Sequence, residues 1–353
     1  MTDPDRGVRG SDAAGAAIPG APGDPLRIPS TEPGSVVVWC WSRGHAPERL
    51  EGVDSIAEAL GRTDGRVFVD LVEPTADQIR SVASALDLHP LIAEDIEERN
   101  QRPKVEMTGP ALHVVLFAVA YAGETHLTEV DLVLGERFVL AAHDRAFRPE
   151  LAVMARREDV PALERGPDFV LWAIADAIVD GYFPVMDRLE DELDQLQDDV
   201  FARPRGWTLE RVFRVKRELI ELRRAIVPAR EVFNQLTNRT SPLIRAEQVL
   251  YFRDVYDHLI RVTDELDTDR ELVAGTLDVY LSSVNNELSD IMKRLTGVTV
   301  ILAGIGAAAG IFGMSEAGAA FRGGEATGFW LVTALVVGGA VAAAVLLRRI
   351  GWI

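Results

Sequence analysis

The sequence LTGVTVILAGIGAAAGIFGM occupies residues 295–314, and GFWLVTALVVGGAVAAAVLL occupies residues 328–347. Each stretch is 20 residues long and has no charged side chain. This is the length and composition that a helix needs to cross about 30 Å of hydrocarbon. The two stretches therefore predict two transmembrane helices, joined by an external loop at residues 315–327. The alternative is a buried helical hairpin in a soluble protein, although soluble core helices rarely run so long without a charge.

Basic residues flank the two predicted spans. Lys293 and Arg294 precede the first span, and Arg348 and Arg349 open a basic tail at residues 348–353. The positive-inside rule places both of these ends in the cytoplasm. We therefore expect a multi-pass protein in the lipid bilayer of the cell (inner or plasma) membrane, with both termini cytoplasmic. Residues 1–34 hold six Gly, six Pro and five Ala without an apolar core, which predicts a disordered tail and no signal peptide.

The net charge of the chain indicates which classes of binding partner to expect. The 353 residues include 37 basic and 55 acidic side chains, a formal net charge of −18. Nucleic acid and anionic lipid repel such a chain unless it carries a segregated basic patch, so we expect no nucleic-acid partner and favour cations. Cys40 is the single cysteine, which excludes an internal disulfide framework and a multi-cysteine zinc site.

The pattern changes twice between the tail and the membrane. Residues 35–165 predict a cytosolic α/β domain, with β-branched runs near 36–41, 67–72, 113–122, 130–134 and 138–142 and helical patterns near 54–60 and 76–86. Residues 166–248 predict a helical region broken at Pro204, Pro228 and Pro242. Residues 249–294 contain no Pro and predict a stalk helix that continues into the first span. From residue 249 to 314 such a helix would reach about 100 Å, at about 1.5 Å per residue.

One stripe of this long helix has the spacing of a coiled-coil seam. Its members follow one another in alternating steps of four and three, an average of 3.5 residues. They are Asp278, Ser282, Asn285, Ser289, Met292, Thr296, Thr299, Ala303, Gly306, Gly310 and Gly313. The stripe is polar in its cytosolic half and small or hydroxyl-bearing in its membrane half. Two interpretations stay open: close packing of helices through small residues such as Gly306 and Gly310, or several copies around a water-filled path.

A second stripe is acidic. Residues 168–199 contain ten acidic side chains and one basic side chain, Arg188. On a helix, six aspartates fall on one face opposite an apolar face. They are Asp176, Asp180, Asp187, Asp191, Asp194 and Asp198. Such a ridge is usually a solvated face, and the alternative is a reservoir that concentrates divalent cations near a pore mouth. Gly181 and Pro184 could kink the helix and separate the first two aspartates from the rest.

Several short motifs lie along the chain outside the two predicted spans. The most specific are YFRDVYDH at residues 251–258 and the pattern Met292-Lys293-x-Leu295-Thr296. Further motifs are His89-Pro90-Leu91, Glu94-Asp95-Ile96, QRPKVE at residues 101–106 and Leu222-Arg223-Arg224. In these motifs and in their order, the sequence resembles the CorA-type magnesium/divalent-cation channel family, and the resemblance covers about residues 67–353. It implies a funnel-shaped homopentamer with an α/β cytosolic domain, a long stalk helix, a first span that lines the pore and a second span outside it.

The resemblance also implies where Mg²⁺ binds, both as the transported and as the regulatory ion. Asp95 and Asp254 fall on family positions that form an intersubunit regulatory site, where bound metal holds the ring together and favours a closed pore. Carboxylates from two subunits suit Mg²⁺, which prefers oxygen and keeps most of its waters. Without the family, an ordinary surface ion pair with Arg99 or Arg253 would explain both aspartates. The family's pore positions fall on Asp278, Ser289, Met292, Leu295, Thr299, Ala303, Gly306, Gly310 and Gly313, which match the stripe except for Leu295 in place of Thr296.

The sequence departs from the family at the end of the first span. The family has Gly-Met-Asn there, and this chain has Gly313-Met314-Ser315 as its selectivity motif. Ser289 also replaces a family asparagine. Serine is shorter than asparagine and has one donor where the amide has two, so a serine ring would bind a hydrated ion more weakly.

We therefore expect a channel that passes hydrated Mg²⁺ passively, with Co²⁺ and Ni²⁺ as further candidates, gated by cytosolic Mg²⁺. The alternatives are a variant with altered selectivity or direction, such as Zn²⁺ or efflux, and a non-conducting sensor or scaffold. An enzyme is the weakest class, because the chain has no Walker loop, no His-Glu-x-x-His and no Gly-x-Ser-x-Gly.

Overall fold

The computed structural model describes residues 33–42, 45–121, 123–149, 152–153, 162–202, 206–313 and 325–352. Almost all of the predicted tail at residues 1–34 lies outside these residues, as do Pro204, Met314 and Ser315. The predictions made for those residues are therefore not tested by the structure.

A seven-stranded sheet forms the centre of the N-terminal α/β domain. Its order is β2-β1-β3-β7-β6-β5-β4, and β3 and β7 are the parallel pair among antiparallel neighbours. The strands are β1 (Ser35–Ser42), β2 (His45–Glu51), β3 (Arg66–Val72), β4 (Lys104–Thr108), β5 (Ala111–Tyr121), β6 (Thr125–Leu134) and β7 (Phe138–His143). The five strands expected from β-branched runs are present. The edge strands β2 and β4 were missed because they are polar and lack the alternation that a half-buried strand shows.

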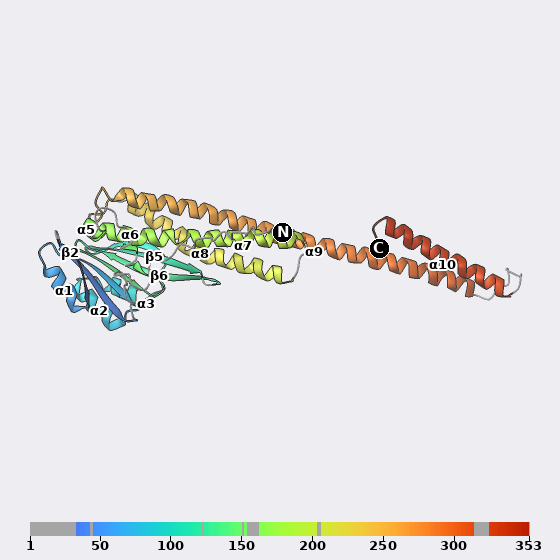
Figure 1. Ribbon diagram of the computed structural model, residues 1–353, viewed down its shortest axis with the longest axis horizontal. Coiled ribbons are helices and arrows are strands. Elements are labelled where there is room, and N and C mark those ends of the chain that lie inside the picture. The colour runs from blue at the N-terminus through green and yellow to red at the C-terminus, as the bar shows by residue number, and fades with distance from the viewer. Residues whose placement is uncertain are drawn as a thin grey trace, which may run out of the picture.

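Helices cover both faces of the sheet. One face carries α1 (Asp54–Gly61), α2 (Ala76–Ala85) and α3 (Pro90–Glu98), and the other carries α6 (Pro167–Asp180) and the longer helices (Figure 1). The short helix α5 (Ala162–Arg165) leads into α6. Each face of the sheet has its own hydrophobic core, and successive strand residues pack into them alternately. Val67 and Val69 pack under α1–α3, and Phe68 packs with α6–α9. The predicted α/β class is thus confirmed.

Helix α6 is part of the domain core. Nearly all of its residues are buried, and a turn at Gly181 and Tyr182 separates it from α7 (Phe183–Ala202). The kink anticipated at Gly181 is therefore a break between two helices. Residues 167–202 are long and apolar enough to span a membrane, but 72% of their most apolar window is buried in the protein, against 6% for residues 249–311. The first segment is consequently a core element and not a span.

Helix α8 (Gly206–Asn238) passes through Pro228 without a break, so the interruption predicted there is wrong. A proline inside a helix costs about 3 kcal/mol because a backbone hydrogen bond is lost. Here the neighbours Ala225, Ile226 and Ala229 are buried against the core, and this packing offsets the cost.

Helix α9 (Val249–Gly313) is a single helix of 65 residues, as the sequence predicts. Its first half packs on α7 and α8 as far as Tyr280, and its second half leaves the domain (Figure 1). Helix α10 (Glu325–Arg349) returns antiparallel along it and begins three residues before the expected span. Residues 281–311 are almost all exposed, so the alternative of a hairpin buried in a soluble core is excluded.

Candidate ion pathway and cation sites

The second half of α9 has three distinct faces. Gly297, Ile301 and Ala308 are the less exposed positions of this stretch, and they fall within about 40° of one another at 100° per residue. Because α10 is the element that packs there, this face is the one toward α10. Thr299, Ala303, Gly306 and Gly310 point roughly 180–240° away from Gly297 by the same spacing. The stripe of polar and small residues therefore lies on the side of α9 opposite α10.

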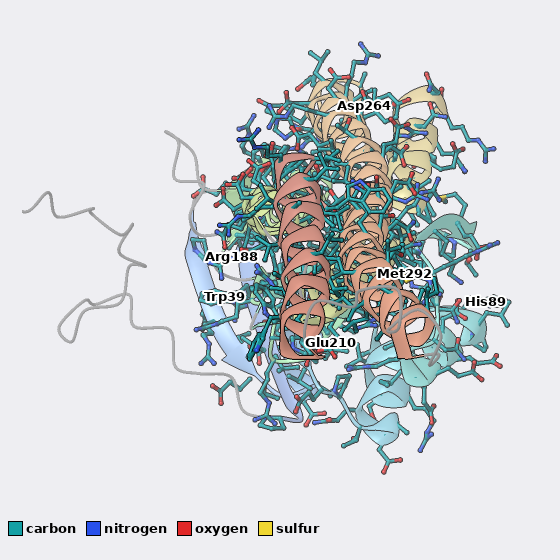
Figure 2. All side chains as sticks on the ribbon, turned by 90° about the vertical axis from the view of Figure 1, so that its right-hand side faces the viewer. Trp39, His89, Arg188, Glu210, Asp264 and Met292 are labelled. Carbon is teal, nitrogen blue, oxygen red and sulfur yellow. The ribbon has the colours of Figure 1, made fainter. Side chains whose placement is uncertain are left out.

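The predicted pore positions whose exposure the structure describes are uncovered in the protomer. Those with described side-chain exposure are exposed: Asp278, Ser289, Met292, Leu295, Thr299, Ala303, Gly306 and Gly310. Gly313 is the last residue of α9. Figure 2 shows Met292 on α9. The described residues of one protomer thus leave the stripe open to a path or to another copy.

A third face of α9 is apolar and equally exposed. Its residues follow steps of three and four, and each is 37–62% exposed. They are Leu281, Val284, Leu288, Ile291, Leu295, Val298, Leu302 and Ile305. This apolar seam has the heptad spacing of a left-handed coiled coil and runs beside the polar stripe along its whole length. Leu295 belongs to this series by spacing, and Thr296 to the polar stripe.

Asp95 lies on α3 above the edge of the sheet. Its Oδ2 is 2.6 Å from Lys104 Nζ on β4, and the two side chains are 23% and 19% exposed. The ion pair considered with Arg99 is absent among the described residues, because Arg99 donates to the carbonyl of His143 instead. Asp95 is therefore already part of an ion pair, with a different cation from the one anticipated.

A row of ionisable groups crosses the sheet beneath Asp95. His113 Nε2 is 2.8 Å from Asp131 Oδ1, and both residues are 1% exposed. The other ring nitrogen of His113 is 3.8 Å from Asp95 Oδ2. Burial, with the nearby charges of Asp131 and Asp95, raises the pKa of Glu129 to about 7. The sheet under Asp95 is thus rich in buried acidic groups.

Asp254 lies in the second turn of α9 and is exposed, with no ion pair to Arg253 or to any other described residue. It is on the opposite side of the sheet from Asp95, since α9 belongs to the core cluster of α6–α8 and α3 to that of α1 and α2. Figure 2 shows the same separation, with Asp264 of α9 far from His89, the residue that caps α3. Asp95 and Asp254 of one protomer therefore do not meet.

A cluster that the sequence did not single out lies one turn from Asp254. Asp176, Asp180 and His258 offer ligand atoms that all lie within 4.8 Å of one another. Asp176 is 4% exposed, and His258 Nδ1 is 3.6 Å from Asp180 Oδ1. The spacing of the two aspartates by four residues was visible as part of the acidic ridge. Their partner on α9 was not, because only the packing of α6 on α9 brings His258 to them.

The rest of the acidic ridge is solvated. Asp187, Asp191, Asp194 and Asp198 on α7 are exposed, opposite the buried Leu189. The face expected on α7 is confirmed, whereas Asp176 belongs to the interior of the domain.

Comparisons with known proteins agree with one another. The family described as "CorA-like Mg2+ transporter protein" matches residues 63–349. The cobalt/magnesium transport protein CorA of Thermotoga maritima is 38% identical over 245 residues, covering 68% of this chain and 70% of the relative. The cobalt/magnesium transport protein CorA of Methanocaldococcus jannaschii is 24% identical over 290 residues, covering 81% and 91%.

Solved structures show the same fold. The complete CorA magnesium transporter from Methanocaldococcus jannaschii superposes with a TM-score of 0.75 at 23% identity, covering 90% of this chain and 98% of that one. The full-length CmaX protein superposes with a TM-score of 0.70 at 17% identity, covering 91% and 99%. The α/β domain, the long helix and the terminal hairpin thus occur together in other proteins.

Proposed function

The chain belongs to the CorA-like Mg²⁺ transporter family, a family of membrane transporters and not of enzymes, and from this we propose that it is a passive channel for hydrated Mg²⁺. Co²⁺ and Ni²⁺ are further ions that the same path would accept. An inside-negative potential moves a divalent ion inward with about 4.6 kcal/mol per 100 mV, so no coupled reaction is needed.

The three faces of α9 carry this proposal. A pore built from several copies needs one wettable face toward the axis, one apolar face toward the neighbouring copy and one face toward the outer helix. The polar stripe, the apolar seam and the side toward α10 supply these three in the required order around the helix. We infer a homopentamer in which α9 lines the pore, α10 lies outside it, and both termini are cytoplasmic.

The separation of Asp95 and Asp254 supports regulation between subunits. Asp254 is exposed, Asp95 is partly exposed, and each lies on its own side of the sheet, so a site that uses both needs the Asp95 of one protomer and the Asp254 of the next. We propose that cytosolic Mg²⁺ bound there stabilises a closed ring, and that its loss leaves carboxylates that repel and loosen the ring. Asp176, Asp180 and His258 provide further ligands beside Asp254.

Flux measurements test both parts. The purified protein in vesicles that contain a Mg²⁺-sensitive dye should admit Mg²⁺ under an inside-negative potential. With millimolar Mg²⁺ on the cytosolic side, Asp254→Ala should raise the flux, because the closing ion is bound more weakly. Asp264→Ala removes an exposed aspartate of the same helix and should behave as wild type. An intact pentamer that passes no divalent ion would refute the channel, and equal fluxes for the two variants would refute the gating site.

A further inference from the structure

We propose that Lys104 is a tethered cation that competes with the divalent ion for Asp95, and so sets the Mg²⁺ concentration at which the regulatory site fills. The proposal rests on the regulatory role of Asp95 proposed above. It adds a residue of the α/β domain, outside any ligand set, that tunes the response of the channel.

The contact between the two side chains is close and well shielded. Lys104 Nζ is 2.6 Å from Asp95 Oδ2 and 3.6 Å from Glu106 Oε2. About four fifths of each of the paired side chains is covered, with 19% of Lys104 and 23% of Asp95 exposed. Screening by solvent is weak at such a position, so the ammonium neutralises Asp95 more effectively than an exposed lysine would.

The backbone fixes Lys104 in this place. It is the first residue of the edge strand β4 and pairs with Val115 on β5, which turns its side chain to the same face as His113 and Asp131. Asp95 projects toward that face from α3. Burial alone would lower the pKa of Lys104, but the bond to Asp95 and the charge of Glu106 outweigh it and raise the pKa, so the side chain stays charged at neutral pH.

An ammonium and a divalent cation both bind to the negatively charged oxygens of a carboxylate. Mg²⁺ binds through carboxylate oxygens, directly or through its waters, and gains most from a full negative charge. With Lys104 on Oδ2, the incoming ion meets a partly neutralised carboxylate and a positive charge within a few ångströms. The ion must therefore displace the ammonium or accept the repulsion, and either cost weakens its binding. The exposed Asp254 has no comparable cation among the described residues.

Removing the charge of Lys104 while keeping its stem should strengthen Mg²⁺ binding. We expect Lys104→Met to lower the half-saturating Mg²⁺ concentration by about two- to tenfold, the range spanned by exposed to partly buried ion pairs. Lys104→Gln should act in the same direction, and it guards against a Met variant that aggregates through the edge strand. Lys104→Arg keeps the charge and should stay near wild type.

The measurement is the thermal unfolding midpoint of the full-length protein in detergent as a function of Mg²⁺ concentration, because a bound ion stabilises the state that binds it. The relevant signal is the part of the Mg²⁺-dependent shift that Asp95→Asn abolishes. Arg80→Met is the matched control, since it removes an exposed positive charge from α2 that pairs with Asp77 and Glu97 and not with Asp95.

The outcomes separate the two proposals. If Asp95→Asn leaves the Mg²⁺-dependent shift intact, the regulatory site itself is wrong. If Asp95→Asn abolishes part of the shift but Lys104→Met and Lys104→Gln leave the half-saturating concentration unchanged or raise it, Lys104 is not a competitor and instead holds Asp95 in place. A lowered concentration in both variants, with Lys104→Arg and Arg80→Met at the wild-type value, supports the competition.

Discussion

Asp168 is a buried carboxylate, 3% exposed, whose ion-pair partner is Arg245. Arg245 donates to it from Nη2 at 2.7 Å, from Nε at 2.8 Å and from its backbone nitrogen at 3.1 Å. Arg245→Met leaves the negative charge buried without its partner, which costs on the order of 2–3 kcal/mol when the arginine is itself half exposed. We expect a clear fall in the thermal unfolding midpoint.

Arg224→Met is the control for that prediction. Arg224 pairs with Glu221 on the surface of α8, both side chains being at least 48% exposed, and such pairs contribute about 0–1 kcal/mol. Equal midpoints for the two variants would show that Asp168 does not depend on Arg245.

Single residues also show where sequence reasoning stops. Asp95 and Asp254 were found only through the family motifs around them, because an isolated aspartate has no spacing that marks it as a ligand. Lys104 and His258 lay inside the quoted motifs, and their partners come from other elements. Contacts between residues far apart in the chain are fixed by packing, which periodicity alone does not specify.

At the scale of elements, the contact between α7 and α9 predicts a pH dependence. Asp269 on α9 is 6% exposed, and its burial, with the charges of Glu190, Glu265 and Asp194, raises its pKa to about 6. An acid with a raised pKa binds its proton more tightly in the folded state. Its contribution is therefore fully favourable below the unfolded pKa near 4 and declines as the pH rises through 6.

Asp269→Asn removes this titration. The thermal unfolding midpoint of the variant should exceed that of wild type at pH 8 and approach it at pH 5, because only at the higher pH does wild type carry the buried charge. Asp267→Asn on the same turn is the control, since Asp267 is half exposed and paired with Arg270. A constant difference between Asp269→Asn and wild type across this pH range would contradict the assignment.

The apolar seam of α9 predicts an effect on assembly. Leu288 is 56% exposed in the protomer and lies in the part of the seam that precedes the first predicted span, so a neighbouring copy packed on the seam would bury it. Leu288→Asn should lower the temperature at which the oligomer dissociates in detergent, as measured by size-exclusion chromatography with light scattering. Asn286 lies on the side of α9 away from both the polar stripe and the apolar seam, so Asn286→Ser should have little effect. An unchanged oligomer in Leu288→Asn would place the contact between copies elsewhere.

Elements were predicted best where their periodicity was strong. The buried strands and the 65-residue helix followed from β-branched runs and from the absence of proline. The edge strands did not follow from the sequence, because a polar edge strand lacks the alternation of apolar residues. The passage of α8 through Pro228 did not follow either, because tertiary packing overrides a local propensity.

For the whole molecule, the negative charge is concentrated before the two predicted spans. Residues 295–353 contain three Arg and two Glu, a net charge of +1. The net charge of the whole chain is −18, so that of residues 1–294 is −19. The acidic surface therefore belongs to the part of the chain that precedes the two predicted spans, and it includes the exposed aspartates of α7. It can raise the local concentration of cations at the proposed regulatory site, while the predicted membrane hairpin offers an approaching ion little attraction.

In the proposed channel, ion choice depends on the ring that one residue of each copy forms around the axis, and Ser289 tests this. Ser289 is exposed on the polar stripe close to the membrane, and its hydroxyl offers one donor to the waters of a hydrated ion. Ser289→Asn adds a longer side chain with a second donor. Each hydrogen bond contributes about 0.5–1.5 kcal/mol, so we expect the half-saturating Mg²⁺ concentration for flux to fall by roughly threefold or more. Ser283→Asn makes the same change off the stripe and should leave flux unaltered. If the Zn²⁺ flux exceeds the Mg²⁺ flux in wild type, and this order is reversed in Ser289→Asn, the result would favour a channel of altered selectivity. Equal effects of the two serine substitutions would show that the polar stripe does not face the ion.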